Sequence, residues 1–345
     1  MAFRPQNTLV LTAAELETVS LTALGQLLNR AAASGIGDVI IEIDEMPTAI
    51  IAAVLERGLR LFAGVTCFHE HGTITLENPS VTRPIDADGS PRERLEWYTG
   101  LIPTDPYVVD ELIQRCARLA RTPGVSGLVL DFIRWPLHWE LEARETGPSL
   151  PAASFDPQTL TAFARWADGS GDEAAPLPSS RQLLGNLLPQ WTEFRCQVVT
   201  DIVERISRAI ARTGASLGAF VVPIPSARRK ASTGQDVAAW EPFIDALYPM
   251  TYHAIMQRSP EWIGTIVDEL RTESGHPVVP VVQLTADKEF ADPWDWGEQF
   301  GLNELSRVLQ RAAEGGPVAA FPGTALRAPQ ATLLTEAVTV TADRR

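Results

Sequence analysis

The chain has 345 residues, of which 45% are hydrophobic, and carries a formal net charge of −14 at neutral pH. This length and apolar content fit a large globular domain. The acidic charge argues against nucleic acids and anionic membrane surfaces as partners, because both require a basic protein surface.

Apolar runs that are typical of buried strands alternate with helical patterns along the chain. The predicted strands span residues 7–12, 38–45, 59–70, 125–130, 216–223, 244–252, 277–284 and 316–321. The predicted helices span residues 21–34, 48–57, 106–121, 192–213 and 303–314. Pro280 lies inside the seventh strand, where a proline removes a backbone donor. The eight alternations favour a single closed (β/α)8 TIM barrel over an open doubly wound sheet.

Two long segments interrupt the alternation of strands and helices. Residues 71–104 follow the third predicted strand, and residues 137–190, rich in Pro, Gly, Ser and acids, follow the fourth. Both leave the carboxyl end of the strands, where barrels of this type build their active sites. We therefore expect residues 1–345 to form one barrel domain with two insertions on its catalytic face.

The sequence predicts neither a cofactor nor a metal site. No glycine-rich phosphate loop follows a strand, and the three cysteines form no CxxC pair. His69 and His71 could bind zinc, but such a site needs further ligands. No secretory signal pattern and no apolar run of membrane-spanning length is found, so we expect a cytoplasmic protein without a membrane partner. The oligomeric state is left open.

Residues 124–136, GVSGLVLDFIRWP, form the most informative segment. Its apolar run ends in Asp131, Arg134 and Trp135, the pattern of a buried parallel strand followed by polar groups. The chemistry of α/β barrels lies at that end of the strands. A carboxylate, a guanidinium group and an aromatic ring suit a sugar site, where they supply an acid, a hydroxyl clamp and a stacking surface.

Several ordered segments resemble the glycoside-hydrolase-like TIM-barrel family related to hypothetical glycosyl hydrolase family 10. They include EWYTGLIPTDP, GVSGLVLDFIRWP, FDPQTLTAFARW, WTEFRCQVVTDIV, LGAFVVP and IDALYPMTYH, and the resemblance covers about residues 90–325. It implies a glycosidase whose strand-four acid is Asp131, followed by the family's Arg and aromatic residue at Arg134 and Trp135. The Trp at the start of a family helix falls on Trp191.

The resemblance also places a sixth-strand pattern on Tyr252 and His253, which are then expected to bind substrate. One position departs from the family, because Ser126 stands where the family has an acid before the strand-four aspartate. Ser126 lies deep in the strand, so this loss affects packing more than chemistry.

Glycoside hydrolysis usually requires two carboxyl groups, one on each side of the scissile bond. Asp131 is predicted to be the nucleophile or base. The fifth and sixth strands end without an acid, so Asp44 and Glu70 are the predicted partners. A salt-bridging role for either is equally compatible with the sequence. Strand alternation places Glu42 on the same face as Asp44, and an acid at that depth needs a partner such as Arg134.

The remaining candidates bind substrate. His69 and Gln283 are predicted to hydrogen-bond sugar hydroxyls, and Trp135 and Trp191 to stack on sugar rings. The alternative for the tryptophans is that half of them pack the insertions onto the barrel. The sequence therefore predicts an enzyme that cleaves glycosidic bonds of an oligo- or polysaccharide. The alternative is a non-catalytic carbohydrate-binding barrel, which the acid-poor strand ends would also fit.

Overall fold

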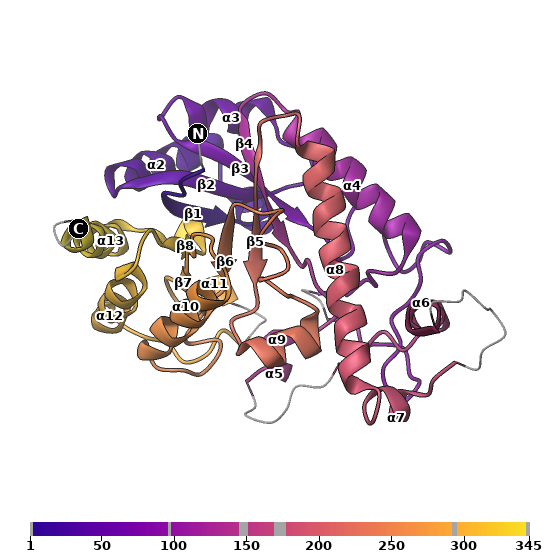
Figure 1. Ribbon diagram of the computed structural model, residues 1–345. Coiled ribbons are helices and arrows are strands. Elements are labelled where there is room, and N and C mark those ends of the chain that lie inside the picture. Colours follow the sequence, from indigo (N-terminus) through magenta and orange to yellow (C-terminus); the bar gives the residue numbers. More distant parts are fainter. Residues whose placement is uncertain (1–2, 96–97, 145–150, 169–176, 292–294, 343–345) are drawn as a thin grey trace.

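The computed structural model describes residues 3–95, 98–144, 151–168, 177–291 and 295–342. Eight parallel strands form a nearly closed barrel with helices around it, which confirms the predicted (β/α)8 TIM barrel (Figure 1). The strands are β1 (Asn7–Leu11), β2 (Ile36–Glu42), β3 (Arg60–Thr66), β4 (Val125–Asp131), β5 (Ser216–Val221), β6 (Ala246–Pro249), β7 (Val281–Gln283) and β8 (Ala319–Phe321).

The strand order around the barrel is β6-β5-β4-β3-β2-β1-β8-β7, and single bridges join β6 to the segment of β7. At this seam the Leu247 amide donates to the Pro277 carbonyl at 2.9 Å, and the Val279 amide donates to the Leu247 carbonyl at 2.8 Å. The seventh strand is shorter than predicted and begins only after Pro280. The reason is that Pro280 cannot donate a ladder hydrogen bond.

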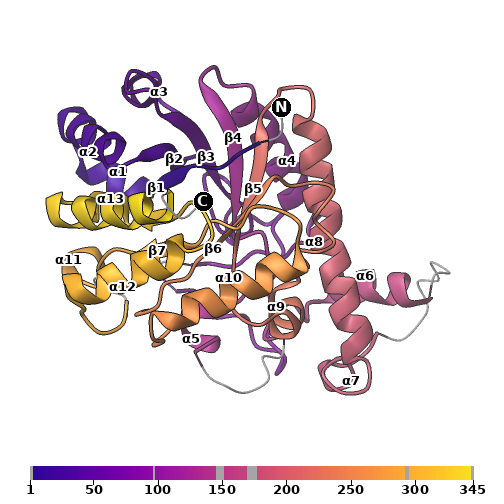
Figure 2. The same ribbon diagram turned by 60° about the vertical axis from the view of Figure 1, so that its left-hand side comes forward.

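Helices cover the outside of the barrel, and the longest described one, α8, packs along α4 (Figures 1 and 2). Farther round the barrel, α10, α12 and α13 lie side by side. The helices are α1 (Ala13–Thr18), α2 (Leu21–Ala33), α3 (Thr48–Leu55), α4 (Pro106–Ala120), α5 (Trp139–Glu142), α6 (Pro157–Asp168), α7 (Ser180–Leu183), α8 (Leu188–Ile210), α9 (Ser226–Thr233), α10 (Glu261–Glu273), α11 (Lys288–Ala291), α12 (Leu302–Ala313), η1 (Gly323–Ala325) and α13 (Ala328–Ala342).

Alternate strand residues point into the barrel and form layers, as expected for this fold. The middle of the barrel is apolar and includes Ile40, Phe62 and Val129. The layer above it, at the carboxyl ends of the strands, carries Glu42 and Asp131 instead. The barrel is therefore closed by packed side chains below and opens onto polar groups at the end predicted to be catalytic.

The chain between β3 and α4 packs against the chain that follows β4. Asp105 caps α4 and also accepts a hydrogen bond from the Thr82 amide at 2.7 Å. Gln158 of α6 accepts from the Thr82 hydroxyl at 2.6 Å and donates to the Thr104 carbonyl at 2.7 Å. These bonds fix the two long segments to each other beside the mouth of the barrel.

Candidate functional site

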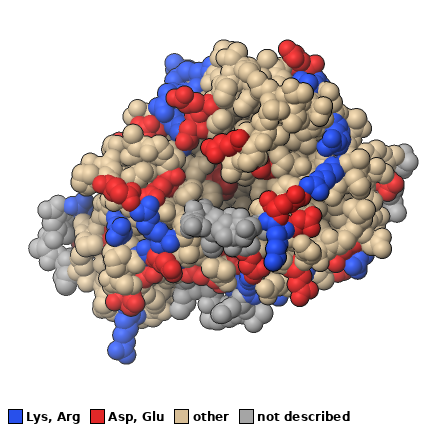
Figure 3. All heavy atoms as spheres, turned by 180° about the vertical axis from the view of Figure 1, so that it is seen from behind, with Lys and Arg blue, Asp and Glu red and all other residues tan. Residues whose placement is uncertain are grey.

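A cavity of about 900 Å³ lies at the carboxyl ends of the strands, and residues from or following every strand line it. Figure 3 shows the molecule from behind, with a hollow near the middle of this face and acidic side chains in and around it. Helix α5, in the segment after β4, contributes Trp139, Glu140 and Leu141 to the wall. The cavity is large enough for sugar rings and lies where barrel enzymes hold their substrates.

Asp131 is the last residue of β4 and lines this cavity. Its Oδ1 accepts a hydrogen bond from the Phe132 amide at 2.6 Å. Phe132 has a φ of 49°, a left-handed conformation that a bulky side chain rarely adopts. Such strain persists only where the surrounding structure enforces it, and it clusters at functional sites. The turn at Phe132 directs the chain away and leaves the Asp131 carboxylate at the cavity.

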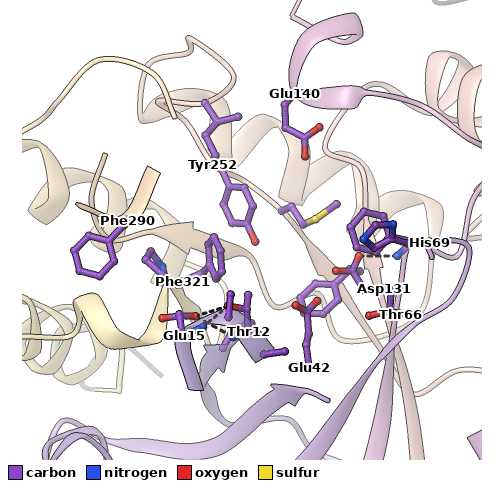
Figure 4. A pocket seen from close by; sticks show the side chains of 18 of the residues that line it. Thr12, Glu15, Glu42, Thr66, His69, Asp131, Glu140, Tyr252, Phe290 and Phe321 are labelled. Atoms are coloured by element: carbon purple, nitrogen blue, oxygen red, sulfur yellow. Dashed lines mark hydrogen bonds between the residues drawn. The ribbon is translucent and has the colours of Figure 1, made fainter. Parts of the chain in front are cut away.

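Glu42, at the end of β2, points toward Asp131 (Figure 4). Burial raises the pKa of Glu42 well above its ordinary value, and the charge of Asp131 and a hydrogen bond between the two side chains raise it further. The negative charge of Asp131 beside it therefore favours the protonated form of Glu42. The partner that the sequence suggested for Glu42 was Arg134, but the structure places it with Asp131.

Glu140 of α5 enters the cavity from another side than Glu42 (Figure 4). Burial raises the pKa of Glu140 to about 7, and the nearby charge of Asp131 adds to the effect. A carboxyl group with this pKa holds a proton near neutral pH and can release it, which is the property of a general acid. Glu140 is not among the site residues predicted from the sequence. Its one signal is its position beside Trp139, just after the strand-four motif.

Tyr252 lies among these three acids. Burial raises the pKa of Tyr252 well above its ordinary value, and the charges of Asp131, Glu42 and Glu140 raise it further, so the hydroxyl keeps its proton. Its ring stacks on Phe321 with the centroids 5.1 Å apart. A protonated phenol among carboxyl groups is a hydrogen-bond donor for a sugar oxygen.

His69 and Arg134 also line the cavity. His69 Nδ1 lies 3.1 Å from both the amide and the carbonyl of Thr99, and burial lowers the pKa of His69, which keeps the ring neutral. The Arg134 guanidinium lies over the Tyr98 ring, 4.8 Å from its centroid, and donates to the Leu137 carbonyl at 2.7 Å. Arg134 therefore packs in the wall of the cavity and also places a positive charge there.

Asp44 and Glu70, the two predicted catalytic acids, lie at the rim, and each already holds an arginine. Arg115 Nη1 is 2.5 Å from Asp44 Oδ1, and Arg94 Nη2 is 2.7 Å from Glu70 Oε2. The Asp44 side chain is also 47% exposed. These contacts match the salt-bridging alternative for both residues.

The two tryptophans predicted to stack on sugar lie outside the cavity lining. Trp135 and Trp191 are each 0% exposed and pack together, with ring centroids 6.4 Å apart. The Trp135 indole donates to the Arg195 carbonyl at 3.0 Å, and the Arg195 guanidinium lies over its ring. Their placement corrects the stacking prediction, because the chain turns after Phe132 and carries Trp135 into the core beside α8.

His253 and Gln283, predicted to bind sugar, are also absent from the lining. His253 lies against the Phe300 ring, and its Nε2 is 3.1 Å from Glu304. Gln283 is fully buried, accepts from the Ile255 amide at 3.3 Å and donates to the carbonyls of Thr285 and Trp296. Both side chains are committed to contacts within the protein, which corrects their assignment as substrate ligands.

Other aromatic side chains take the position expected of the two tryptophans. Trp139 packs against Tyr252 with centroids 6.0 Å apart, and Trp296 packs against Phe321 at 5.5 Å. All four, together with Phe290, line the cavity. Tyr252, Phe290 and Phe321 lie on one side of the cavity and His69 lies on the other (Figure 4), and we call the five aromatic residues the aromatic wall.

Within the residues that the structure describes, no group of three or more His, Cys, Asp or Glu side chains is arranged to hold a metal ion. The three cysteines are free and buried. No helix of the described chain is long and apolar enough to cross a membrane.

No family model and no curated protein matches the sequence. Among solved structures, the PgaB (BpsB) glycoside hydrolase domain from Bordetella bronchiseptica has a TM-score of 0.69 at 13% identity, over 97% of this chain and 99% of that chain. The catalytic domain of a beta-amylase from Paenibacillus polymyxa has a TM-score of 0.68 at 10% identity, over 99% and 100% of the two chains.

A beta-galactosidase from the haloarchaeon Halorubrum lacusprofundi has a TM-score of 0.65 at 14% identity, over 97% of this chain and 58% of that chain. The resemblance to proteins related to hypothetical glycosyl hydrolase family 10 thus has support from the shared fold and none from a family model. At these identities the likeness shows the fold alone, a TIM barrel of the kind found in glycoside hydrolases.

Proposed function

We propose that this chain is a glycoside hydrolase that cleaves glycosidic bonds of an oligo- or polysaccharide, with Asp131 as nucleophile or base and Glu140 as general acid. The observation that carries the proposal is the pair of carboxyl groups at one cavity. No ion pair with Lys or Arg is found for either among the described residues, and Glu140 has a pKa of about 7. The structural neighbours named as a glycoside hydrolase domain, a beta-amylase and a beta-galactosidase support this class.

Asp131 and Glu140 have environments suited to different steps. Glu140 gives its proton to the leaving oxygen as the glycosidic C–O bond breaks. As a nucleophile, Asp131 forms an ester bond to the anomeric carbon, and a water molecule then cleaves this ester while Glu140 takes a proton from it. As a base, Asp131 instead takes a proton from the attacking water and later releases it to solvent. Glu140, now ionised, recovers a proton from water at the end of the cycle, so the net reaction consumes one water molecule for each bond cleaved.

Glu42 is not the acid of this proposal, because its carboxyl group is in hydrogen-bond contact with Asp131. The two acting carboxyl groups of a glycosidase lie about 5–9.5 Å apart, so that the sugar or a water molecule fits between them. A hydrogen-bonded pair leaves no such space. Asp44 and Glu70 shape the rim through Arg115 and Arg94.

The aromatic wall is the proposed surface for the sugar ring. Trp139, Tyr252 and Phe321 line the cavity, and aromatic rings pack against the C–H side of a pyranose. His69 and the Tyr252 hydroxyl are neutral polar groups for the sugar hydroxyls. Together these residues account for binding and leave Asp131 and Glu140 for chemistry.

The test is hydrolysis of a panel of glycans, measured as released reducing ends. Wild type is expected to cleave at least one glycan, whereas Asp131→Asn and Glu140→Gln are each expected to lose about 10²–10⁴-fold in kcat/KM. Glu204→Gln is the matched control, because Glu204 lies on α8 outside the cavity lining and pairs with Arg208, and this variant is expected to behave as wild type. An Asp131→Asn variant that folds and keeps full activity would refute the assignment. Glycan binding without hydrolysis by wild type would favour the non-catalytic alternative.

A cytoplasmic location is part of the same proposal, and the three free, buried cysteines support it because reduced thiols are usual in a reducing compartment. Fractionation of the native cells, with the protein detected by antibody, tests this location.

A further inference from the structure

We propose that Glu42 is a positioning residue for Asp131, a neutral carboxyl group that donates a hydrogen bond to the Asp131 carboxylate and keeps its own proton during the reaction. This inference rests on the proposed function, since it assigns Glu42 a task in the same site. It distinguishes Glu42 from Glu140, the acid that gives its proton to substrate.

The barrel register brings the two carboxyl groups together across one strand. Glu42 of β2 is paired with Gly64 of β3, and Thr66 of β3 is paired with Asp131 of β4. A Cβ atom on Gly64 would lie 2.7 Å from Glu42 Cγ, closer than real Cβ contacts allow. Because Gly64 has no side chain, the Glu42 side chain can lie across β3 at this position. Its carboxyl group then points toward Asp131 (Figure 4).

The charges around Glu42 favour the protonated form. Glu15 of α1 and Asp131 of β4 act on it with negative charge, and the neutral Tyr252 hydroxyl lies on the β6 side. The strand between Glu42 and Asp131 supplies only Gly64 and Thr66, neither of which is charged. Arg134, the arginine of the lining, lies over the Tyr98 ring and donates to a backbone carbonyl. A proton on Glu42 is thus the direct way to relieve repulsion with Asp131.

The second restraint on Asp131 comes from the backbone. Its Oδ1 accepts from the Phe132 amide, so the Glu42 carboxyl and this amide together fix the orientation of the carboxylate. If Glu42 loses its proton, the hydrogen bond is replaced by repulsion between two adjacent carboxylates. Activity should then fall at alkaline pH for a reason that does not involve the leaving group.

The leaving group separates this effect from the role of Glu140. A 2,4-dinitrophenyl glycoside of the sugar identified in the glycan panel needs no proton from an acid, so deprotonation of Glu140 no longer limits its cleavage. On this substrate, wild type and Glu140→Gln are both expected to lose activity at alkaline pH. Glu42→Gln keeps a hydrogen-bond donor that cannot ionise, and it is expected to retain kcat within about tenfold and to lose the alkaline decline.

Glu42→Met is the matched variant, because methionine has similar length but no donor. It is expected to lower kcat about 10- to 100-fold more than Glu42→Gln, with little change in KM. Equal kcat for the two variants, or an alkaline decline that is unchanged in Glu42→Gln, would overturn the proposal. Thermal denaturation of both variants shows whether they fold.

An infrared titration tests the protonated carboxyl group without any activity. In the Glu140→Gln background, the C=O stretch of a neutral carboxylic acid should persist at neutral pH, disappear on Glu42→Gln and remain in Glu204→Gln. If no variant hydrolyses any glycan but this band behaves as expected, the proposed function fails and the carboxyl pair stands. If the band is absent while activity is normal, the inference about Glu42 fails alone.

Discussion

Substitution of Glu140 by glutamine should change stability and activity in opposite directions. Burial raises the pKa of Glu140 from an ordinary 4.5 to about 7. Because the folded-state pKa is the higher one, the folded protein holds the proton more tightly than the unfolded chain. The protonated Glu140 therefore adds to the free energy of unfolding. This contribution is complete below about pH 4.5, declines as the pH rises and is lost above about pH 7.

The size of this loss follows from the shift. A pKa that rises from 4.5 to about 7 corresponds to at most about 3 kcal/mol of unfolding free energy. Glutamine cannot ionise, so Glu140→Gln lacks the decline. Relative to wild type, the variant should therefore gain up to about 3 kcal/mol between acidic and mildly alkaline pH, while its glycosidase activity falls.

The assay is urea-induced unfolding of wild type and Glu140→Gln at a series of pH values, with Glu204→Gln as the control for a carboxyl group outside the cavity. The difference in unfolding free energy between wild type and Glu140→Gln should widen steadily as the pH rises from about 4.5 to about 7. Parallel stability curves for the two proteins would refute a Glu140 that holds its proton near neutral pH, and with it the assignment of this residue as the acid.

Three further substitutions test the structure around the site. Gly64→Ala places a methyl group 2.7 Å from Glu42 Cγ, so it should cost about 1–3 kcal/mol in chemical denaturation and lower kcat; unchanged values for both would contradict the close contact. Trp135→Ala removes a fully buried indole and should cost about 3–5 kcal/mol in urea unfolding, whereas a sugar-stacking role would instead raise KM at unchanged stability. Asp38→Asn weakens the ion pair with Arg60, whose Nε lies 2.7 Å from Asp38 Oδ1. It should lower the melting temperature by the equivalent of about 2–3 kcal/mol and leave kcat unaffected. An unchanged melting temperature would show that the ion pair does not stabilise the fold.

The sequence alone determined the eight-stranded barrel, because continuous apolar runs are readable wherever a strand is buried on both faces. It also placed Asp131 at the end of β4, and in this fold the carboxyl ends of all strands lie at the same end of the barrel. Where the run contained Pro280 the prediction failed in length, and the structure shows only three residues in β7.

Tertiary structure alone decided which acids meet. Glu42, Asp131 and Glu140 come from β2, β4 and α5, and no local pattern records that Gly64 opens the space between the first two. Nor does periodicity extend past a strand end, where a single turn at Phe132 sends Trp135 into the core instead of the cavity. Strand periodicity determines which strand side chains point into the barrel. The path of each loop depends on contacts with segments far away in the chain, and these contacts determine which loop residues reach the cavity.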